Sequence, residues 1–126
     1  MEEYLLSFGK IVVLSDNIAE VIVNEGVVFD EKMVAEYHGF LLERLRAPFS
    51  LLINKKNSYS YTFKAQQIVA NLPEIDMMAV VMGSSAGLMS TETLMKINES
   101  NHWNIKLFKR RSQALHWLLE RVKVRV

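Results

Sequence analysis

Three short segments decide the fold: Phe49-Ser50-Leu51-Leu52-Ile53, Met77-Met78-Ala79-Val80-Val81-Met82 and Ile105-Lys106-Leu107-Phe108. The first two are apolar runs of the length and composition typical of strands buried on both faces, as parallel strands are. Predicted helical segments separate these three strand candidates. Strands that alternate with helices over short connections indicate a parallel sheet with right-handed crossovers. We therefore predict an α/β fold.

The segment before these strands predicts an antiparallel β-meander. Residues 4–8, 11–14 and 18–23 are three further strand candidates. Gly9-Lys10 joins the first two and predicts a two-residue hairpin turn. Asp16-Asn17 supplies turn residues between the second and third strands. The meander is expected to continue directly into the parallel strands.

About four helices are predicted around the sheet. Asp30 begins the first, which Pro48 prevents from continuing. Thr62, Ser90 and Ser112 are expected to cap the others, which run to about residue 71, to about residue 99 and toward the C-terminus. The residues expected to face inward are Phe63, Ile68, Val69 and Leu72 in the second helix and Leu115, Leu118, Leu119 and Val122 in the last.

Length and composition limit the possible classes of protein. The 126 residues suit one domain, here residues 1–126, and with 50% hydrophobic and 23% charged residues the chain can bury a core. Cysteine is absent, which excludes disulfides, thiolate metal sites and a cysteine nucleophile. The net charge of +1 gives no overall field for duplex binding. Binding to nucleic acid is therefore not expected.

The sequence also bears on location. Met1-Glu2-Glu3-Tyr4 carries acids where a secretory signal carries bases. The apolar run 77–82 is far shorter than the roughly 20 residues of a membrane span. We expect a cytoplasmic protein without a membrane span.

Charge is unevenly distributed along the chain. Residues 1–43 hold nine acids and two bases, whereas residues 105–126 hold seven bases and one acid. Basic clusters, Lys55-Lys56 and Lys109-Arg110-Arg111, follow two predicted parallel strands. The carboxyl ends of such strands meet at one sheet edge, where ligands of open α/β sheets bind. The predicted anion-binding edge comprises Lys55, Lys56, Asn57, Ser58, Ser60, Ser84, Ser85, Lys109, Arg110 and Arg111. The alternative is that these are solvated loop residues.

Other patterns are weaker signs of chemistry. Residues 83–87 match G-x-S-x-G, but so short a chain leaves little room for the other parts of a hydrolase, and we interpret them as a tight turn. His38, His102 and His116 lack metal-ligand spacing, so no metal, cofactor or catalytic residue is expected. Trp117 points away from the predicted apolar stripe of its helix. Its ring is expected to cover a neighbouring element of the same chain, or to lie in an interface with a second copy of the chain, forming a homodimer, or with another protein.

The order of elements, the segment 49–60 and Ala114-Leu115-His116-Trp117-Leu118 resemble small bacterial STAS-type domains, particularly the stand-alone SpoIIAA-like branch. The resemblance spans nearly the whole chain. It implies a STAS-type α/β fold and a non-enzymatic regulatory role. In signalling members a serine in an Asp-Ser-Ser-Gly-like turn at a helix start is phosphorylated. Here only Ser58 or Ser60 corresponds to it, and the acid and the glycine are missing.

Two functions from different classes follow. The first is a regulatory or protein-interaction module of STAS type, switched by phosphorylation of Ser58 or Ser60, with Lys55 or Lys56 holding the phosphate. The second is a small-ligand-binding domain that takes an anionic lipid or nucleotide at the basic edge. Some relatives look similar to lipid-transfer domains, which implies an apolar pocket rimmed by bases.

Overall fold

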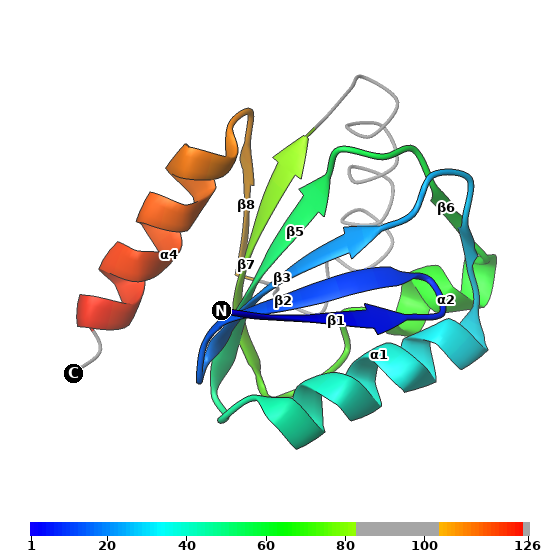
Figure 1. The fold of residues 1–126 in the computed structure, drawn as a ribbon, viewed down its shortest axis with the longest axis horizontal. Coiled ribbons are helices and arrows are strands. Elements are labelled where there is room, and N and C mark those ends of the chain that lie inside the picture. Colours follow the sequence, from blue (N-terminus) through cyan, green and yellow to red (C-terminus); the bar gives the residue numbers. More distant parts are fainter. Residues whose placement is uncertain (83–103, 125–126) are drawn as a thin grey trace.

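A computed structural model gives the structure of the chain and describes residues 1–82 and 104–124, with side chains through Arg121. The main sheet has six strands, and Figure 1 shows it as a fan with helices on both sides. The strands are β1 (Glu2–Leu6), β2 (Gly9–Ser15), β3 (Ile18–Val23), β4 (Val28–Phe29), β5 (Phe49–Lys55), β6 (Ser60–Tyr61), β7 (Ile75–Met82) and β8 (Ile105–Phe108). The helices of the described part are α1 (Glu31–Arg44), α2 (Phe63–Ile68) and α4 (Arg111–Val124).

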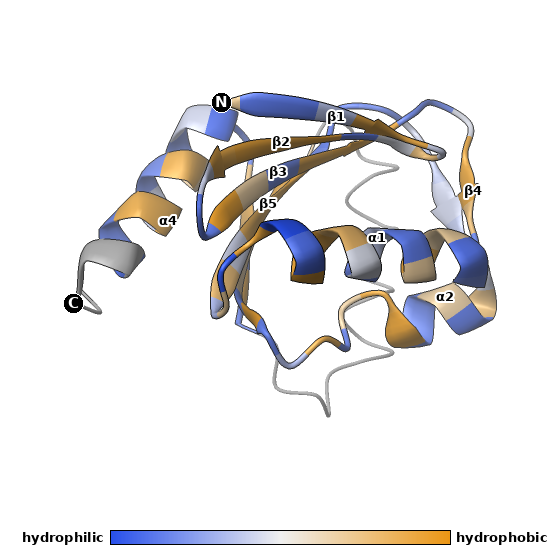
Figure 2. Cartoon of the chain, turned by 60° about the horizontal axis from the view of Figure 1, so that its bottom comes forward, coloured by the Kyte–Doolittle hydropathy of each residue, from blue (hydrophilic) through white to orange (hydrophobic). Residues whose placement is uncertain are grey.

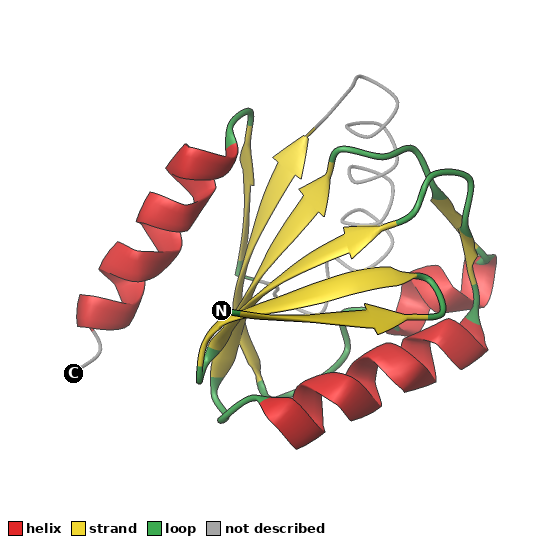
Figure 3. Ribbon diagram, in the orientation of Figure 1, coloured by secondary structure: helices red, strands yellow, loops and turns green. Residues whose placement is uncertain are grey.

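The main sheet confirms the predicted α/β fold with a meander that continues into parallel strands. Its order is β1-β2-β3-β5-β7-β8 (Figure 3). The pairs β1–β2 and β2–β3 are antiparallel, and β3–β5, β5–β7 and β7–β8 are parallel. The residues after β5 and after β8 therefore leave the sheet at the same edge, as predicted from the sequence.

The first hairpin differs from the prediction. Leu6 pairs with Gly9, so the turn is formed by Ser7 and Phe8 rather than by Gly9-Lys10. Phe8 is fully buried. A Cβ on Gly9 would lie 2.1 Å from the carbonyl oxygen of Ile22, so glycine is needed here because β3 comes very close. The predicted turn at Gly9-Lys10 is therefore wrong, and Gly9 instead allows β3 to approach β2 closely.

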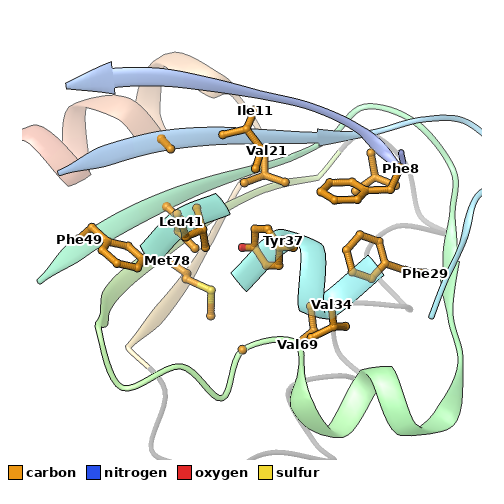
Figure 4. Packing of buried hydrophobic residues seen from close by; sticks show 14 of the residues in the cluster. Phe8, Ile11, Val21, Phe29, Val34, Tyr37, Leu41, Phe49, Val69 and Met78 are labelled. Carbon is orange, nitrogen blue, oxygen red and sulfur yellow. The ribbon is translucent and has the colours of Figure 1, made fainter. Parts of the chain in front are cut away.

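Two hydrophobic clusters hold the helices on opposite faces of the sheet. The larger one lies under α1 and α2 and includes Phe8, Tyr37 and Leu41, whose packing is shown in Figure 4. The smaller one lies under α4 and includes Leu52 and Leu118. Figure 2 shows hydrophobic residues along the central strands between these layers. Burial of apolar surface on both faces explains why β5 and β7 are apolar along most of their length.

The caps of α1 and α2 were predicted correctly. The carboxylate of Asp30 accepts from the backbone N–H of Met33 at 2.9 Å, and the hydroxyl of Thr62 accepts from that of Ala65 at 3.2 Å. However, α2 ends at Ile68, earlier than predicted. The inward position of Phe63 was wrong, because its side chain is 69% exposed.

The last helix also needs two corrections. It begins at Arg111, so Ser112 lies in the first turn and is not the cap. Leu119 is 47% exposed, whereas Trp117 packs on Phe108 with ring centroids 5.7 Å apart. The inward face is therefore rotated toward Ala114, Leu118 and Trp117, because the strand β8 offers an aromatic partner on that side.

Some predictions fall outside the described residues: the loop with Ser84 and Ser85, the helix from Ser90 to about residue 99, and His102. Among the helices of the described part, none combines the length and the apolar character that crossing a membrane requires.

Candidate functional site

A short two-stranded ribbon stands beside the main sheet and was not predicted. It forms because β4 and β6 pair in parallel, with Val28 opposite Ser60. The N–H of Ser60 donates to Val27 O at 3.0 Å, and that of Thr62 donates to Phe29 O at 3.0 Å. Gly26, with a φ of 79°, leads into the ribbon and donates to Ser58 O at 2.7 Å. The ribbon fixes the segment 58–62 next to α1 and the sheet.

The ribbon, α1 and the sheet enclose an apolar pocket of about 50 Å³. Four strands of the main sheet form one wall, and the ribbon, α1 and the end of α2 form the others. Figure 4 shows five of the lining side chains, Val21, Phe29, Tyr37, Val69 and Met78. The described lining residues are Val21, Val23, Phe29, Tyr37, Ile53, Lys55, Tyr59, Tyr61, Val69, Ala70, Met78, Val80 and Ile105.

Lys55 is the one charged side chain among these lining residues. It is the last residue of β5, and strand alternation turns it to the face covered by α1. It is only 4% exposed. Its Nζ lies 3.4 Å from the Tyr61 hydroxyl and 5.0 and 5.1 Å from the ring centroids of Tyr59 and Tyr61. Within the described chain, no carboxylate lies within ion-pair distance of this Nζ.

Among the described lining residues, the tyrosines supply the remaining polar side-chain atoms. The hydroxyls of Tyr59 and Tyr61 are 3.3 Å apart, so one donates to the other. Burial raises the pKa of Tyr59 well above the ordinary value of a phenol, and the neighbouring Tyr61 raises it further. Burial likewise raises the pKa of Tyr37. At neutral pH, Tyr37 and Tyr59 are therefore neutral phenols that can donate hydrogen bonds.

A second polar cluster lies on the opposite face of the sheet, under the start of α4. Glu20 in β3 is 4% exposed and accepts from Arg111 through Nε at 3.1 and 3.0 Å and through Nη2 at 2.8 Å. Asn54 Nδ2 donates to the same carboxylate at 3.0 Å. Burial alone raises the pKa of Glu20, but the hydrogen bonds from Arg111 and Asn54 outweigh it and hold the pKa below its ordinary value. The cluster anchors α4 to the sheet.

The structure divides the predicted basic edge. Lys55 lies inside the pocket and is 4% exposed, whereas the Arg111 side chain is 45% exposed and pairs with Glu20. Lys56, Lys109 and Arg110 are exposed and follow the carboxyl ends of β5 and β8. The anion edge stays a prediction for these three residues.

The predicted polar residues between β5 and α2 lie on or near the ribbon. The Asn57 side chain donates to Val23 O at 2.9 Å and ties the loop to β3. Ser58 and Ser60 are exposed, and the N–H of Ser58 donates to the Glu25 carboxylate at 3.0 Å. Neither serine begins a helix, because α2 starts at Phe63 after its cap Thr62.

The other residues singled out in the sequence, Trp117, His38 and His116, do not line the Lys55 pocket. Trp117 is partly buried, and the Arg121 guanidinium lies 5.9 Å from its ring centroid; its use as an interface stays a prediction. The Nε2–H of His38 donates to Val69 O at 2.7 Å, and His116 pairs with Glu120 at 3.3 Å. Across the described residues, no three His, Asp or Glu side chains gather as a metal site requires.

Sequence reasoning missed Glu20, Tyr59 and Tyr61. A single acid within the otherwise apolar strand 18–23 was the available signal for Glu20, since a buried carboxylate needs a partner. The alternation Ser58-Tyr59-Ser60-Tyr61 was a signal that the two tyrosines share a face.

No family model, curated protein or solved structure matches this chain.

Proposed function

We propose that this chain is a small-ligand-binding domain whose ligand occupies the pocket at Lys55. The observation that carries the proposal is that Lys55 is 4% exposed and that its Nζ contacts two aromatic rings and one hydroxyl. The ligand has an apolar part, which the valine, isoleucine and methionine side chains cover, and a group that accepts a hydrogen bond from Nζ. This places the ligand inside the fold and not on the predicted outer rim.

The energetics of Lys55 support a binding role. Lysine is rarely buried without a paired charge, because removing an ammonium from water is costly. Each desolvated contact between the ammonium and an aromatic ring offsets up to about 2 kcal/mol of this cost. An apolar residue in this pocket would avoid that cost and pack equally well. A lysine that costs stability inside an apolar pocket is typical of a site that serves binding.

The first prediction concerns Lys55→Met. Methionine has a side chain of similar length to lysine but carries no charge. The free energy of unfolding is therefore expected to rise by about 1 kcal/mol, while ligand binding is lost. Binding is measured by ¹H–¹⁵N NMR with a mixture of small acids, amides, alcohols and phosphates. In the parent chain, shifts are expected at the amides of Val21, Val23, Val80 and Ile105.

Lys56→Met is the matched control, because this neighbouring lysine is exposed and does not line the pocket. It is expected to change the unfolding free energy by less than about 0.5 kcal/mol and to keep the parent's shifts. The proposal is contradicted if no compound shifts the pocket amides of the parent. It is also contradicted if Lys55→Met binds as the parent does.

We keep a STAS-type regulatory module as a second candidate function, since one observation favours it. Ser60 lies on the ribbon and Ser58 just before it; both are exposed, and Tyr59 and Tyr61, which alternate with them, line the pocket. A phosphate on this ribbon would therefore change the covering wall of the pocket. Ser60 is the better acceptor, because a phosphate at Ser58 would meet the Glu25 carboxylate.

The second candidate predicts phosphate on Ser60 in preference to Ser58. Phosphopeptide mass spectrometry of the chain isolated from the cells that make it measures this. The Ser60→Ala variant provides the control, since it should lose most of the modification. Unmodified Ser58 and Ser60 in the isolated chain would remove the candidate.

A further inference from the structure

The charge inside the Lys55 pocket restricts the class of ligand. Among the described lining residues Lys55 is the one cation, and none of them is an acid. A ligand with a single negative charge balances the charge of these described lining residues. A phosphate monoester carries about −1.5 to −2 at neutral pH and would leave excess negative charge in an apolar surrounding. A neutral ligand would leave Lys55 without a counter-charge.

The donors of the pocket fit the two oxygens of a carboxylate. Lys55 Nζ lies 3.4 Å from the Tyr61 hydroxyl, and that hydroxyl lies 3.3 Å from the Tyr59 hydroxyl. These three groups form one continuous row of polar atoms among the residues that line the pocket. A carboxylate bound there accepts from Nζ with one oxygen and from a phenol with the other, and charge-assisted hydrogen bonds of this kind are the strong ones.

The apolar part of the pocket sets the size of the ligand. Its walls include Val21, Ile53, Met78, Val80 and Ile105, all hydrophobic. The volume is about 50 Å³. This is several times the roughly 10–15 Å³ that one water needs, so the pocket has room for a small molecule.

We infer that the ligand of this pocket is a small monocarboxylate with a short aliphatic body, its carboxylate bound by Lys55 Nζ and by one of the two tyrosine hydroxyls. The inference rests on the proposed ligand-binding function and narrows it to one chemical class. It also separates this site from the rim of Lys56, Lys109 and Arg110, which faces solvent.

The test compares compounds that share one aliphatic body and differ in the polar group: isovalerate, isovaleramide, isoamyl alcohol and isobutyl phosphate. Calorimetry gives the affinities, and NMR shifts at Val23 and Ile105 give the location. Isovalerate is expected to bind at the pocket, and each of the other three about 10- to 100-fold more weakly, which is the range for losing a hydrogen bond to a charged group.

Variants link the affinity to named atoms. Lys55→Met should abolish the preference for isovalerate, and Tyr61→Phe, which keeps the ring, should weaken isovalerate by about 5-fold. Lys56→Met should leave it unchanged. Circular dichroism checks that each variant is folded, and Tyr61→Phe keeps the test informative if Lys55→Met does not fold.

The outcomes distinguish the inference of a carboxylate ligand from the proposed ligand-binding function. If the amide, the alcohol or the phosphate binds at the pocket as tightly as isovalerate, the carboxylate class is overturned and the ligand-binding function stands. If none of the four compounds, and none of the broader mixture, shifts the pocket amides, both are overturned. An unchanged preference for isovalerate in Lys55→Met overturns the assignment of Lys55 as the carboxylate anchor.

Discussion

Gly9→Ala is expected to lower the free energy of unfolding by about 3 kcal/mol, the upper end of the usual cost of overpacking. The added Cβ would lie 2.1 Å from Ile22 O and 2.9 Å from Val23 Cα. Both are backbone atoms, so no side chain can move aside, and β2 and β3 must separate locally. Because Val23 also lines the pocket, ligand binding should weaken as well. Urea denaturation measures the stability.

Gly39→Ala is the matched control for Gly9→Ala. Gly39 lies in the middle of α1, is exposed, and a Cβ there meets nothing within 4 Å. Alanine should therefore raise the unfolding free energy by about 1 kcal/mol through its higher helix propensity. A loss of stability in Gly9→Ala no larger than about 0.5 kcal/mol would contradict the close approach of β3 to Gly9.

Arg111→Met is expected to lower the free energy of unfolding by about 3 kcal/mol at pH 7. The reason is that Glu20, 4% exposed, would keep its charge with only Asn54 as a donor. The Arg111 side chain is 45% exposed, so water partly replaces it, and the low end of the range of about 3–5 kcal/mol applies. Urea denaturation at several pH values measures the difference from the parent.

The pH dependence of the stability loss in Arg111→Met shows whether the charge of Glu20 causes that loss. In the parent the pKa of Glu20 lies below its ordinary value, so the stability from this group is fully present above the unfolded pKa. It is lost as the pH falls through the lower, folded pKa. The difference between Arg111→Met and the parent should therefore be largest above about pH 5 and shrink in acid, where Glu20 is protonated in both.

Two further variants complete this test. Arg110→Met removes a neighbouring exposed base and should change stability by less than about 0.5 kcal/mol. Glu20→Met combined with Arg111→Met should recover most of the loss, because no buried charge remains. A deficit in Arg111→Met that does not depend on pH would show that packing of the arginine stem, and not the charge of Glu20, is what matters.

Much of the main sheet was predictable from local patterns. The apolar runs 49–53 and 77–82 lie within β5 and β7, and Asp30 and Thr62 cap their helices as predicted. Such signals are local, since they depend on side-chain periodicity and on the hydrogen-bonding groups of a few neighbours. The ribbon of β4 and β6 was missed because two-residue strands carry no periodicity, and only their mutual hydrogen bonds define them.

Lys55 and Lys56 show most clearly what the sequence determined and what only the tertiary structure decided. The sequence determines that the two lysines follow the apolar run 49–53. The structure extends β5 to Lys55, which therefore shares a face with Ile53. Which face is covered depends on distant segments: α1, Tyr59 and Tyr61 close over Lys55, while Lys56 stays exposed. A strand pattern specifies the direction of a side chain. Burial, and with it the charge environment of a binding site, is a property of everything that packs against it.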